Sequence, residues 1–545
     1  MPNTIDIYGD SVVTNWFVDR TISYFEDDTI TSIGSYAFAN CYQLSSVNFP
    51  AVTKISIYAF SNCSSLTSVS FPAATSIGAN AFFSCSNLTA VSFSLTTSID
   101  MQAFARCSGL TSVSFPVTTV IANGAFMDCV GLTSVIFPSV TSIGGTVFQN
   151  CSGLTSVSFP VATTIGMSAF RACTGLTSVS FPAVIDIAGY AFYDCSSLTS
   201  VSFPVTKSIG TSAFASCSSL TSVNFPSVTT IGGSAFYFCS NLAAASFPVA
   251  TNIVSHAFHG CIGLTSVSFP AVTTIGNTAF GGCNSLTSVD FPAVTTIGGY
   301  AFENCTGLTF VSFPVATVIE GTAFHGCNSL TSVSFPAVTS IGGSAFLSCS
   351  SLTTVSFPAA TTIGVAAFAY CTSLELASFP SVTVINSTAF TDCYDLASVD
   401  FPAVKTVSHL AFANCSKLVS VNMPVVSSLG MSVFQFCTTL SSISLASISS
   451  LPTNTFLRCY ELASVYIPLV SYISGTAFLS CSALQTVILG TGISNVCALG
   501  TSGAFMNTNS SFVVYVPDSL VTSYKAATNW SYYSSQIKGI SELLT

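Results

Sequence analysis

The chain repeats itself every 22 residues. The stretch from Cys151 to Cys173, CSGLTSVSFPVATTIGMSAFRAC, represents the unit, and the Phe of its AF pair recurs without a gap from Phe38 to Phe478. This register gives 21 repeats, with a Cys three residues after each such Phe. A unit this short cannot bury its own apolar side chains and must stack on its neighbours, which predicts a solenoid. We therefore expect one extended repeat domain instead of several globular ones.

The first half of each unit predicts a short strand and a turn. In the pattern L-x-x-V-x-F, Val157 and Phe159 lie two residues apart and point to one face of a strand. Ser156 and Ser158 then point to the other face. Pro follows in 18 of the 21 units, where its fixed φ and missing N–H end the strand.

The second half of each unit predicts a helical turn. Ile165 is an isolated apolar residue that we expect to point inward, and Ala169, Phe170 and Cys173 have the spacing of one turn of helix. We therefore predict a short α-helical or 3-10 segment there. The structural ladder of the core is expected at the positions of Leu154, Val157, Phe159, Phe170 and Cys173 in every unit.

These motifs resemble the BspA-type leucine-rich-repeat family. L-x-x-V-x-F is similar to the L-x-x-L-x-L strand of leucine-rich repeats, and the trailing Pro, the Ile-Gly pair and AF-x-x-C resemble the BspA type. The resemblance implies an α/β leucine-rich-repeat solenoid, with a parallel β-sheet on one face, short helical or 3-10 turns on the other, and a cap at both ends. It also implies a surface-exposed or secreted adhesive protein, because most members of this family in bacteria and some protists are of that kind.

Three segments are expected along the chain. Residues 1–29 hold a degenerate half unit rich in charge, with Trp16 where the AF Phe should be, and are interpreted as an N-terminal cap. Residues 30–490 form the solenoid of 21 repeats. Residues 491–545 form a last irregular repeat and a C-terminal helical cap.

The C-terminal cap is predicted from two features. Asp518 follows a Pro and is interpreted as the N-cap of a helix with the sequence SLVTSYKAAT. The aromatic side chains of Trp530, Tyr532 and Tyr533 are expected to cover the exposed end of the stacked core.

Charge and hydropathy exclude two classes of partner. The chain has 10 basic and 20 acidic residues among 545, so no basic stripe exists to follow phosphates and nucleic acid is not expected as a partner. Mean hydropathy is +0.70, but Ser, Thr and Pro interrupt every apolar stretch well before the roughly 18 residues that a spanning helix needs. Of the 46 Phe, 38 lie in two repeat columns, so the apolar content belongs to a stacked core and no membrane insertion is expected.

The cysteines are expected to be thiols. A count of 22 suggests a disulfide framework, but equivalent positions in a sheet stack about 4.8 Å apart with parallel side chains. The Cβ atoms of a disulfide lie about 3.5 to 4.5 Å apart and point toward each other. Cys41 to Cys481 should therefore form a ladder of buried thiols. No metal is expected, because a linear ladder cannot surround a tetrahedral ion.

Departures from the uniform outward Ser columns mark candidate ligand-binding residues. Asp290 and Phe310 interrupt these columns in adjacent units, and Glu303 and His325 share one column after the AF Phe, where they are placed to pair. One hypothesis is a binding hot spot built on Asp290 and Phe310. The alternative is tolerated variation of a surface.

A second, looser group of charges runs from Glu375 to Lys417. Its Asp392, Asp395 and Asp400 raise the possibility of calcium, but they fall at different points of the repeat and form no EF-hand loop. A solvated patch is the expectation. No nucleophile elbow or His–carboxylate arrangement is found either, so we expect no enzymatic activity and no cofactor.

The resulting hypothesis is a non-enzymatic adhesion or partner-binding solenoid that recognises a protein or glycan of a host or neighbouring cell through its sheet face. We expect it outside the cell, at the cell surface or on a virion, although no signal peptide or anchor is visible in the sequence. The alternative is a mechanical role, as a spacer, a filament subunit or a structural protein of a virion tail.

Overall fold

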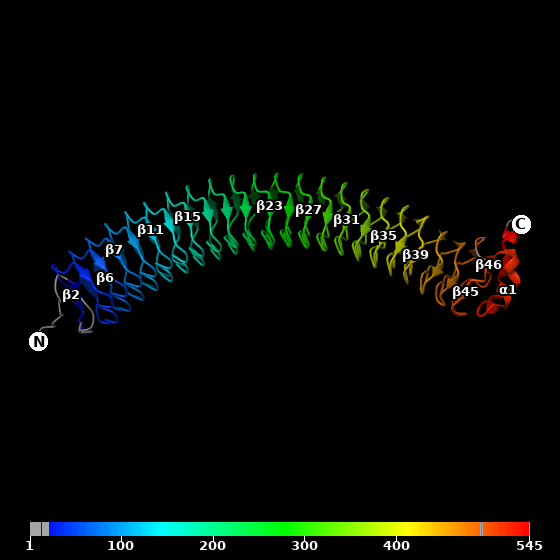
Figure 1. Cartoon of the computed structure of the whole chain (residues 1–545), viewed down its shortest axis with the longest axis horizontal. Helices are drawn as coiled ribbons and strands as arrows, with labels where there is room; N and C mark the ends of the chain where they lie inside the picture. The colour runs from blue at the N-terminus through cyan, green and yellow to red at the C-terminus, as the bar shows by residue number, and fades with distance from the viewer. Residues whose placement is uncertain (1–11, 14–20, 491, 493, 544–545) are drawn as a thin grey trace. The chain divides into compact units, whose positions relative to one another are not determined.

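Each 22-residue repeat forms one turn of a coil that carries two short strands. The computed structural model describes residues 12–13, 21–490, 492 and 494–543. The chain divides into two compact units, Met1–Ala271 and Val272–Thr545, each built from the same coil turn. Figure 1 shows these turns following one another within each unit. The predicted parallel solenoid is confirmed.

The first strand of each turn, here called the serine strand, carries the outward Ser residues. Serine strands recur every 22 residues from β2 (Tyr24–Glu26) to β24 (Ser266–Ser268) in the first unit and from β26 (Ser288–Asp290) to β40 (Ser442–Ser444) in the second. β14 (Ser156–Ser158) pairs in parallel with β16 (Ser178–Ser180), residue by residue. Its central Val is buried and both Ser are exposed, because side chains alternate along a strand. The predicted outward Ser columns are therefore formed.

A second strand, here called the isoleucine strand, was not predicted. Isoleucine strands recur every 22 residues from β3 (Ser32–Ile33) to β23 (Asn252–Ile253) in the first unit and from β25 (Thr274–Ile275) to β43 (Tyr472–Ile473) in the second. β15 (Thr164–Ile165) pairs in parallel with β17 (Asp186–Ile187). In the first unit β1 (Val12–Val13) and the isoleucine strands from β3 to β21 form one eleven-stranded parallel sheet. The coil therefore has a parallel sheet on each of two sides, not on one side alone.

The segment around the AF pair is a series of turns, so the predicted helical segment is wrong. Ser168 and Ala172, two residues before and after Phe170, both have a φ of 57°. A residue in this left-handed region ends a right-handed helix, so only isolated three-residue turns form, such as Cys173 N–H to Phe170 C=O at 3.2 Å. The Phe170 N–H instead donates to Ala191 C=O of the next turn at 2.8 Å. The fold is a β-solenoid, and the α/β class does not describe its repeats.

The core consists of stacked columns of identical side chains. Leu154, Val157, Phe159, Phe170 and Cys173 are each at most 5% exposed. The ring of Phe170 stacks on its equivalent Phe192 at 5.2 Å between centroids and meets Phe159 edge-on at 6.2 Å. Stacked and edge-on contacts are both favourable for aromatic rings. Each turn thus packs against its neighbours through the same few contacts.

Hydroxyl groups bond along the stack in the same periodic way. The N–H and the Oγ1 of Thr177 both donate to the carbonyl of Thr155, at 2.8 and 2.9 Å. The same pair of bonds joins Thr163 to Thr141 beside the isoleucine strands. These Thr hydroxyls bond to backbone oxygens of the neighbouring turn and so add a second hydrogen bond to each backbone contact between turns.

The second unit ends in irregular structure. The serine strands β42 (Ser464–Ile467), β44 (Thr486–Leu489) and β46 (Val513–Val516) pair in parallel, and β47 (Ile537–Gly539) adds to β46. The isoleucine strand β45 (Ala498–Leu499) pairs with β43. Four short helices surround the last strands: η1 (Asp518–Leu520), α1 (Val521–Ala526), η2 (Trp530–Tyr533) and η3 (Ile540–Leu543).

The C-terminal helices differ from the sequence-based expectation in two ways. The Asp518 carboxylate caps no helix and instead accepts hydrogen bonds from the N–H and hydroxyl of Ser541, at 3.3 and 2.8 Å. Trp530 and Tyr533 are buried, but Tyr532 is 75% exposed and only meets the ring of Tyr533 edge-on, at 5.1 Å between centroids. The indole N–H of Trp530 donates to Cys497 C=O at 2.7 Å.

The capping roles themselves remain predictions. At the N-terminus, Trp16 and most of residues 1–29 lie outside the described residues.

Candidate functional site

Two of the protein's hollows lie on the outward face of the serine strands. One has a volume of about 530 Å³ and lies over the strands from β6 (Ser68–Ser70) to β12 (Ser134–Ile136) in the first unit. The other has a volume of about 550 Å³ and lies over β38 (Ser420–Asn422) to β44 in the second unit. Both are lined mainly by Ser hydroxyls and by the edges of the strand Val and Ile residues.

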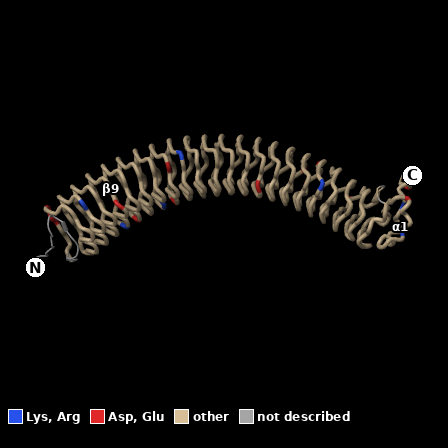
Figure 2. The backbone as a smooth tube through the Cα atoms, viewed as in Figure 1, with Lys and Arg blue, Asp and Glu red and all other residues tan. Residues whose placement is uncertain are grey.

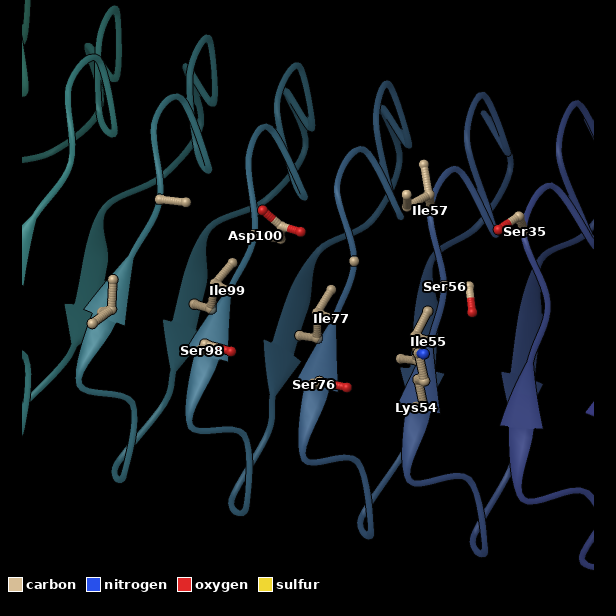
Figure 3. Close-up of a pocket in the computed structure, with 13 residues that line it drawn as sticks. Ser35, Lys54, Ile55, Ser56, Ile57, Ser76, Ile77, Ser98, Ile99 and Asp100 are labelled. Carbon is tan, nitrogen blue, oxygen red and sulfur yellow. The ribbon is translucent and has the colours of Figure 1, made fainter.

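A third hollow, of about 540 Å³, lies over the isoleucine strands of the first unit. Figure 3 shows that its lining comes from equivalent positions of successive turns, such as Ser76 and Ser98, with Lys54 and Asp100 as its charged members. The described hollows are therefore shallow products of the repeat and contain no constellation of catalytic residues.

Asp290 and Phe310 lie on neighbouring serine strands of the second unit. In the register of β26 with β28 (Phe310–Ser312), Phe310 is opposite Ser288 and Asp290 is opposite Ser312, so the two candidates are diagonal neighbours. Both point outward: Asp290 is exposed, and Phe310 is 44% exposed. The buried Val between the outward residues of each strand fixes their positions.

Glu303 and His325 form a separate pair. The Nδ1 of His325 lies 3.4 Å from Oε1 of Glu303, and both side chains are about 30% exposed. They belong to the turns after the AF Phe, whereas Asp290 and Phe310 belong to serine strands. The structure thus brings the four candidates together as two pairs, not as one site.

The acidic group around Asp395 is divided among individual partners. Lys417 Nζ lies 2.7 Å from Asp395 Oδ1, and this contact raises the pKa of Lys417. Asp392 and Asp400 instead accept hydrogen bonds from Asn residues of the next turn, at 2.8 and 2.7 Å. Across the part of the chain that the structure describes, no group of three or more His, Cys, Asp or Glu side chains is placed to hold a metal ion. Figure 2 shows how thinly charge is spread along the backbone.

The cysteine column is buried and hydrogen-bonded. All 22 cysteines of the chain are thiols in the structure, and each lies in the core. The Sγ of Cys173 donates to Phe148 C=O of the preceding turn at 3.0 Å, and this contact repeats along both units. Burial raises the pKa of Cys173 to about 12, so the reactive thiolate is not populated at neutral pH.

The sequence analysis missed a row of large residues at the end of the serine face. In the register of β42, β44 and β46, Tyr466 is opposite Ile488 and Ile488 is opposite Tyr515. All three take the place of an outward Ser, and Tyr466 and Ile488 line the hollow of the second unit. The sequence carries a signal for this row, because the repeat S-F-P becomes Tyr466-Ile-Pro in this unit. The core Phe changes to Ile in the same place, so the two changes together resemble a general weakening of the repeat.

The described residues include no helix with the length and apolarity needed to cross a membrane.

No curated protein matches the chain. Among solved structures, a leucine-rich repeat protein from Bacteroides ovatus is 25% identical over 66% of this chain and 87% of its own, with a TM-score of 0.46. A leucine rich cell surface protein from Faecalibacterium prausnitzii is 24% identical over 60% of this chain and 92% of its own, with a TM-score of 0.33.

The T. pallidum leucine rich repeat protein is 30% identical over 32% of this chain and 82% of its own, with a TM-score of 0.26. The family model described as the BspA type leucine rich repeat region matches residues 17–130, 119–243, 251–375, 295–418 and 383–511. Because these matches span well over half of the sequence, the chain belongs to the BspA-type leucine-rich-repeat family.

Proposed function

We propose that the chain is a non-enzymatic binding scaffold that recognises a protein or glycan partner through the outward face of its serine strands. The observation that carries this proposal is the contrast on that face: uniform small hydroxyls are interrupted by a few exposed large or charged side chains on rigid strands. A uniform face gives every turn the same weak contacts and cannot define one position for a partner. Interface energy concentrates in aromatic and charged residues set among near-neutral contacts.

Asp290 and Phe310 are the proposed hot spot. Phe310 offers an exposed ring whose strand is held by buried Val311, and Asp290 adds the charge of the adjacent strand. The localisation proposed for such a scaffold is the cell surface, the extracellular space or a virion.

The test is binding of the purified chain to arrays of matrix proteins and glycans. The double variant Asp290→Ser with Phe310→Ser restores the repeat background and should weaken binding by about 2 kcal/mol or more, with unchanged melting because both side chains face solvent. Ile136→Ser, which removes an exposed residue of the same face in the first unit, is the matched control. Equal binding by all three proteins would place recognition elsewhere.

A mechanical role is the second candidate, because the Thr hydroxyls are already bonded to the neighbouring turn, which leaves a surface with little to offer a partner. Regular filaments in electron microscopy together with no array hits would favour a spacer or filament subunit.

A further inference from the structure

The last serine strands of the second unit replace the Ser column by a continuous row. Tyr466, Ile488, Tyr515 and Lys538 stand opposite one another in register on β42, β44, β46 and β47. Adjacent strands are about 4.8 Å apart, so the two Tyr lie about 10 Å apart along the row. Their strands are fixed from below, because the alternate residues Val465, Val487 and Val514 are at most 1% exposed. The row is thus a rigid surface feature.

The row borders the hollow of the second unit. Tyr466 and Ile488 line it at one end, the exposed Val419 adds an apolar side chain, and most of the remaining outward lining consists of hydroxyls such as those of Ser442, Ser444 and Ser464. No residue with a formal charge lines this hollow. This lining suits a ligand that is electrically neutral, exchanges hydrogen bonds with hydroxyls, and lies against an aromatic ring.

Neutral carbohydrate satisfies all three conditions. The face of a Tyr ring carries negative quadrupolar charge and attracts the weakly positive C–H groups on the face of a sugar ring. Each Ser hydroxyl donates one hydrogen bond and accepts others, which matches a ligand made of hydroxyls. An anionic ligand would need cations, and the nearest in the row is Lys538, whose Nζ lies 4.0 Å from Glu542. The neutral lining thus complements a neutral ligand.

From this geometry we infer that the hollow over β38 to β44, with the row from Tyr466 to Tyr515, is a binding subsite for a neutral oligosaccharide. The inference rests on the proposed function in one respect, since it uses the same serine face, but it assigns different residues and one ligand class. Tyr466 stacks on a sugar ring, the Ser hydroxyls bond to the ligand's hydroxyls, and Tyr515 extends the platform along the strand order.

The first unit supplies an internal control. Its hollow over β6 to β12 has nearly the same volume and a similar Ser lining but no Tyr, and its one large outward residue is Ile136. A subsite that needs an aromatic platform should exist in the second unit alone.

The experiment is calorimetric titration of the full chain with maltohexaose, cellohexaose and hexa-N-acetylchitohexaose, and with a heparin oligosaccharide as the charged comparison. At least one neutral hexasaccharide should bind. Tyr466→Ser should raise its Kd at least tenfold, Tyr466→Phe should change it less because the ring remains, and Ile136→Ser should leave it unchanged. Tyr466 is 40% exposed, so all variants should keep the wild-type melting temperature.

Three results would overturn the inference: no binding of any neutral hexasaccharide, equal binding by Tyr466→Ser and wild type, or tighter binding of heparin. The proposed function fails separately. A chain that binds a matrix protein through Asp290 and Phe310 but no hexasaccharide refutes the subsite and leaves the scaffold role standing. A chain that binds a hexasaccharide through Tyr466, with no effect of the Asp290 and Phe310 variant, supports the subsite and refutes the proposed hot spot.

Discussion

At the scale of the residue, the position two residues after the AF Phe is one of the two left-handed columns that define the turn segments. Most described residues in it have a φ between 54° and 63°, a region that is costly for ordinary side chains and easiest for Gly, Asn and Asp. Where an Asn follows an Asp or Asn in the column, its amide donates to the residue one turn earlier, as from Asn150 to Asp128 at 2.7 Å and from Asn414 to Asp392 at 2.8 Å. Asn thus serves both needs of this column, because it tolerates a positive φ and its amide donates a hydrogen bond to the preceding turn.

Ser216, with a φ of 61°, follows Asp194 in this column, so Ser216→Asn should recreate the Asp–Asn pair seen elsewhere. We expect stabilisation of about 1 kcal/mol from the added hydrogen bond and from the tolerance of Asn for positive φ. Ser216→Val is the control and should destabilise, because a β-branched side chain is poorly accommodated at positive φ. Denaturant midpoints of the three proteins measure the difference; an Asn variant no more stable than wild type would contradict the pairing argument.

At the scale of the element, the serine strand was predictable and the rest of the coil turn was not. Alternation of Ser with Val157 and Phe159 distinguishes the two faces of a strand even in three residues. The isoleucine strand is only two residues long, too short to show alternation. The spacing of Ala169, Phe170 and Cys173 fits a helix and a series of turns equally well. The residues with positive φ that decide between the two include Ser, Ala, Tyr and Arg, which are residue types that do not predict a left-handed conformation.

The candidate site was predictable to the same degree. Single departures such as Phe310 are visible against a regular background, and strand alternation correctly places them outside. In the row from Tyr466 to Tyr515, the first two residues keep the 22-residue spacing and could be recognised in the sequence, but Tyr515 could not. The insertion before Phe505 lengthens the spacing from 22 to 27 residues, and only the strand pairing of β44 with β46 restores the alignment.

The C-terminal elements carry a test of the proposed cap. Deletion of residues 518–545 removes β47 from the edge of β46 and the buried rings of Tyr524, Trp530 and Tyr533 from the end of the core. The exposed apolar surface and unpaired edge should cause aggregation, measured by light scattering after gel filtration. Tyr532→Ser is the control, since that ring is exposed, and should behave as wild type. A truncated protein that stays monomeric with unchanged melting would refute the capping role.

At the scale of the whole molecule, cohesion comes from contacts that repeat with every turn, and so any property of one turn is multiplied along a unit. The thiol column shows this most clearly. Burial raises the pKa of Cys107, Cys173 and Cys239 from the usual 9.0 to about 12, and other members of the column are raised for the same reason. In the unfolded chain these thiols titrate near the usual value. The pH-dependent contributions of the individual thiols to the free energy of unfolding therefore add up along the column.

The sign of the resulting pH dependence follows from proton binding. Below about pH 8 both states keep their thiol protons, and the column contributes no pH dependence. Above pH 9 the unfolded chain loses protons that the folded chain retains, so stability falls as pH rises, by up to about 1.4 kcal/mol per pH unit for each thiol that unfolds. We expect the denaturant midpoint to be flat between pH 6 and 8 and to fall steeply from pH 9 to 11.

The variant Cys173→Ala isolates one rung of the column. It should be less stable than wild type at pH 7, because it leaves a small cavity, but its stability should fall less steeply with pH because one titrating thiol is gone. Thiolate absorbance recorded in the same samples should rise with unfolding and not before it, since a thiol with a folded pKa of about 12 stays protonated until the turn opens. Stability that is constant from pH 9 to 11, or thiolate formed in the folded state near pH 9, would show that the column is accessible to water.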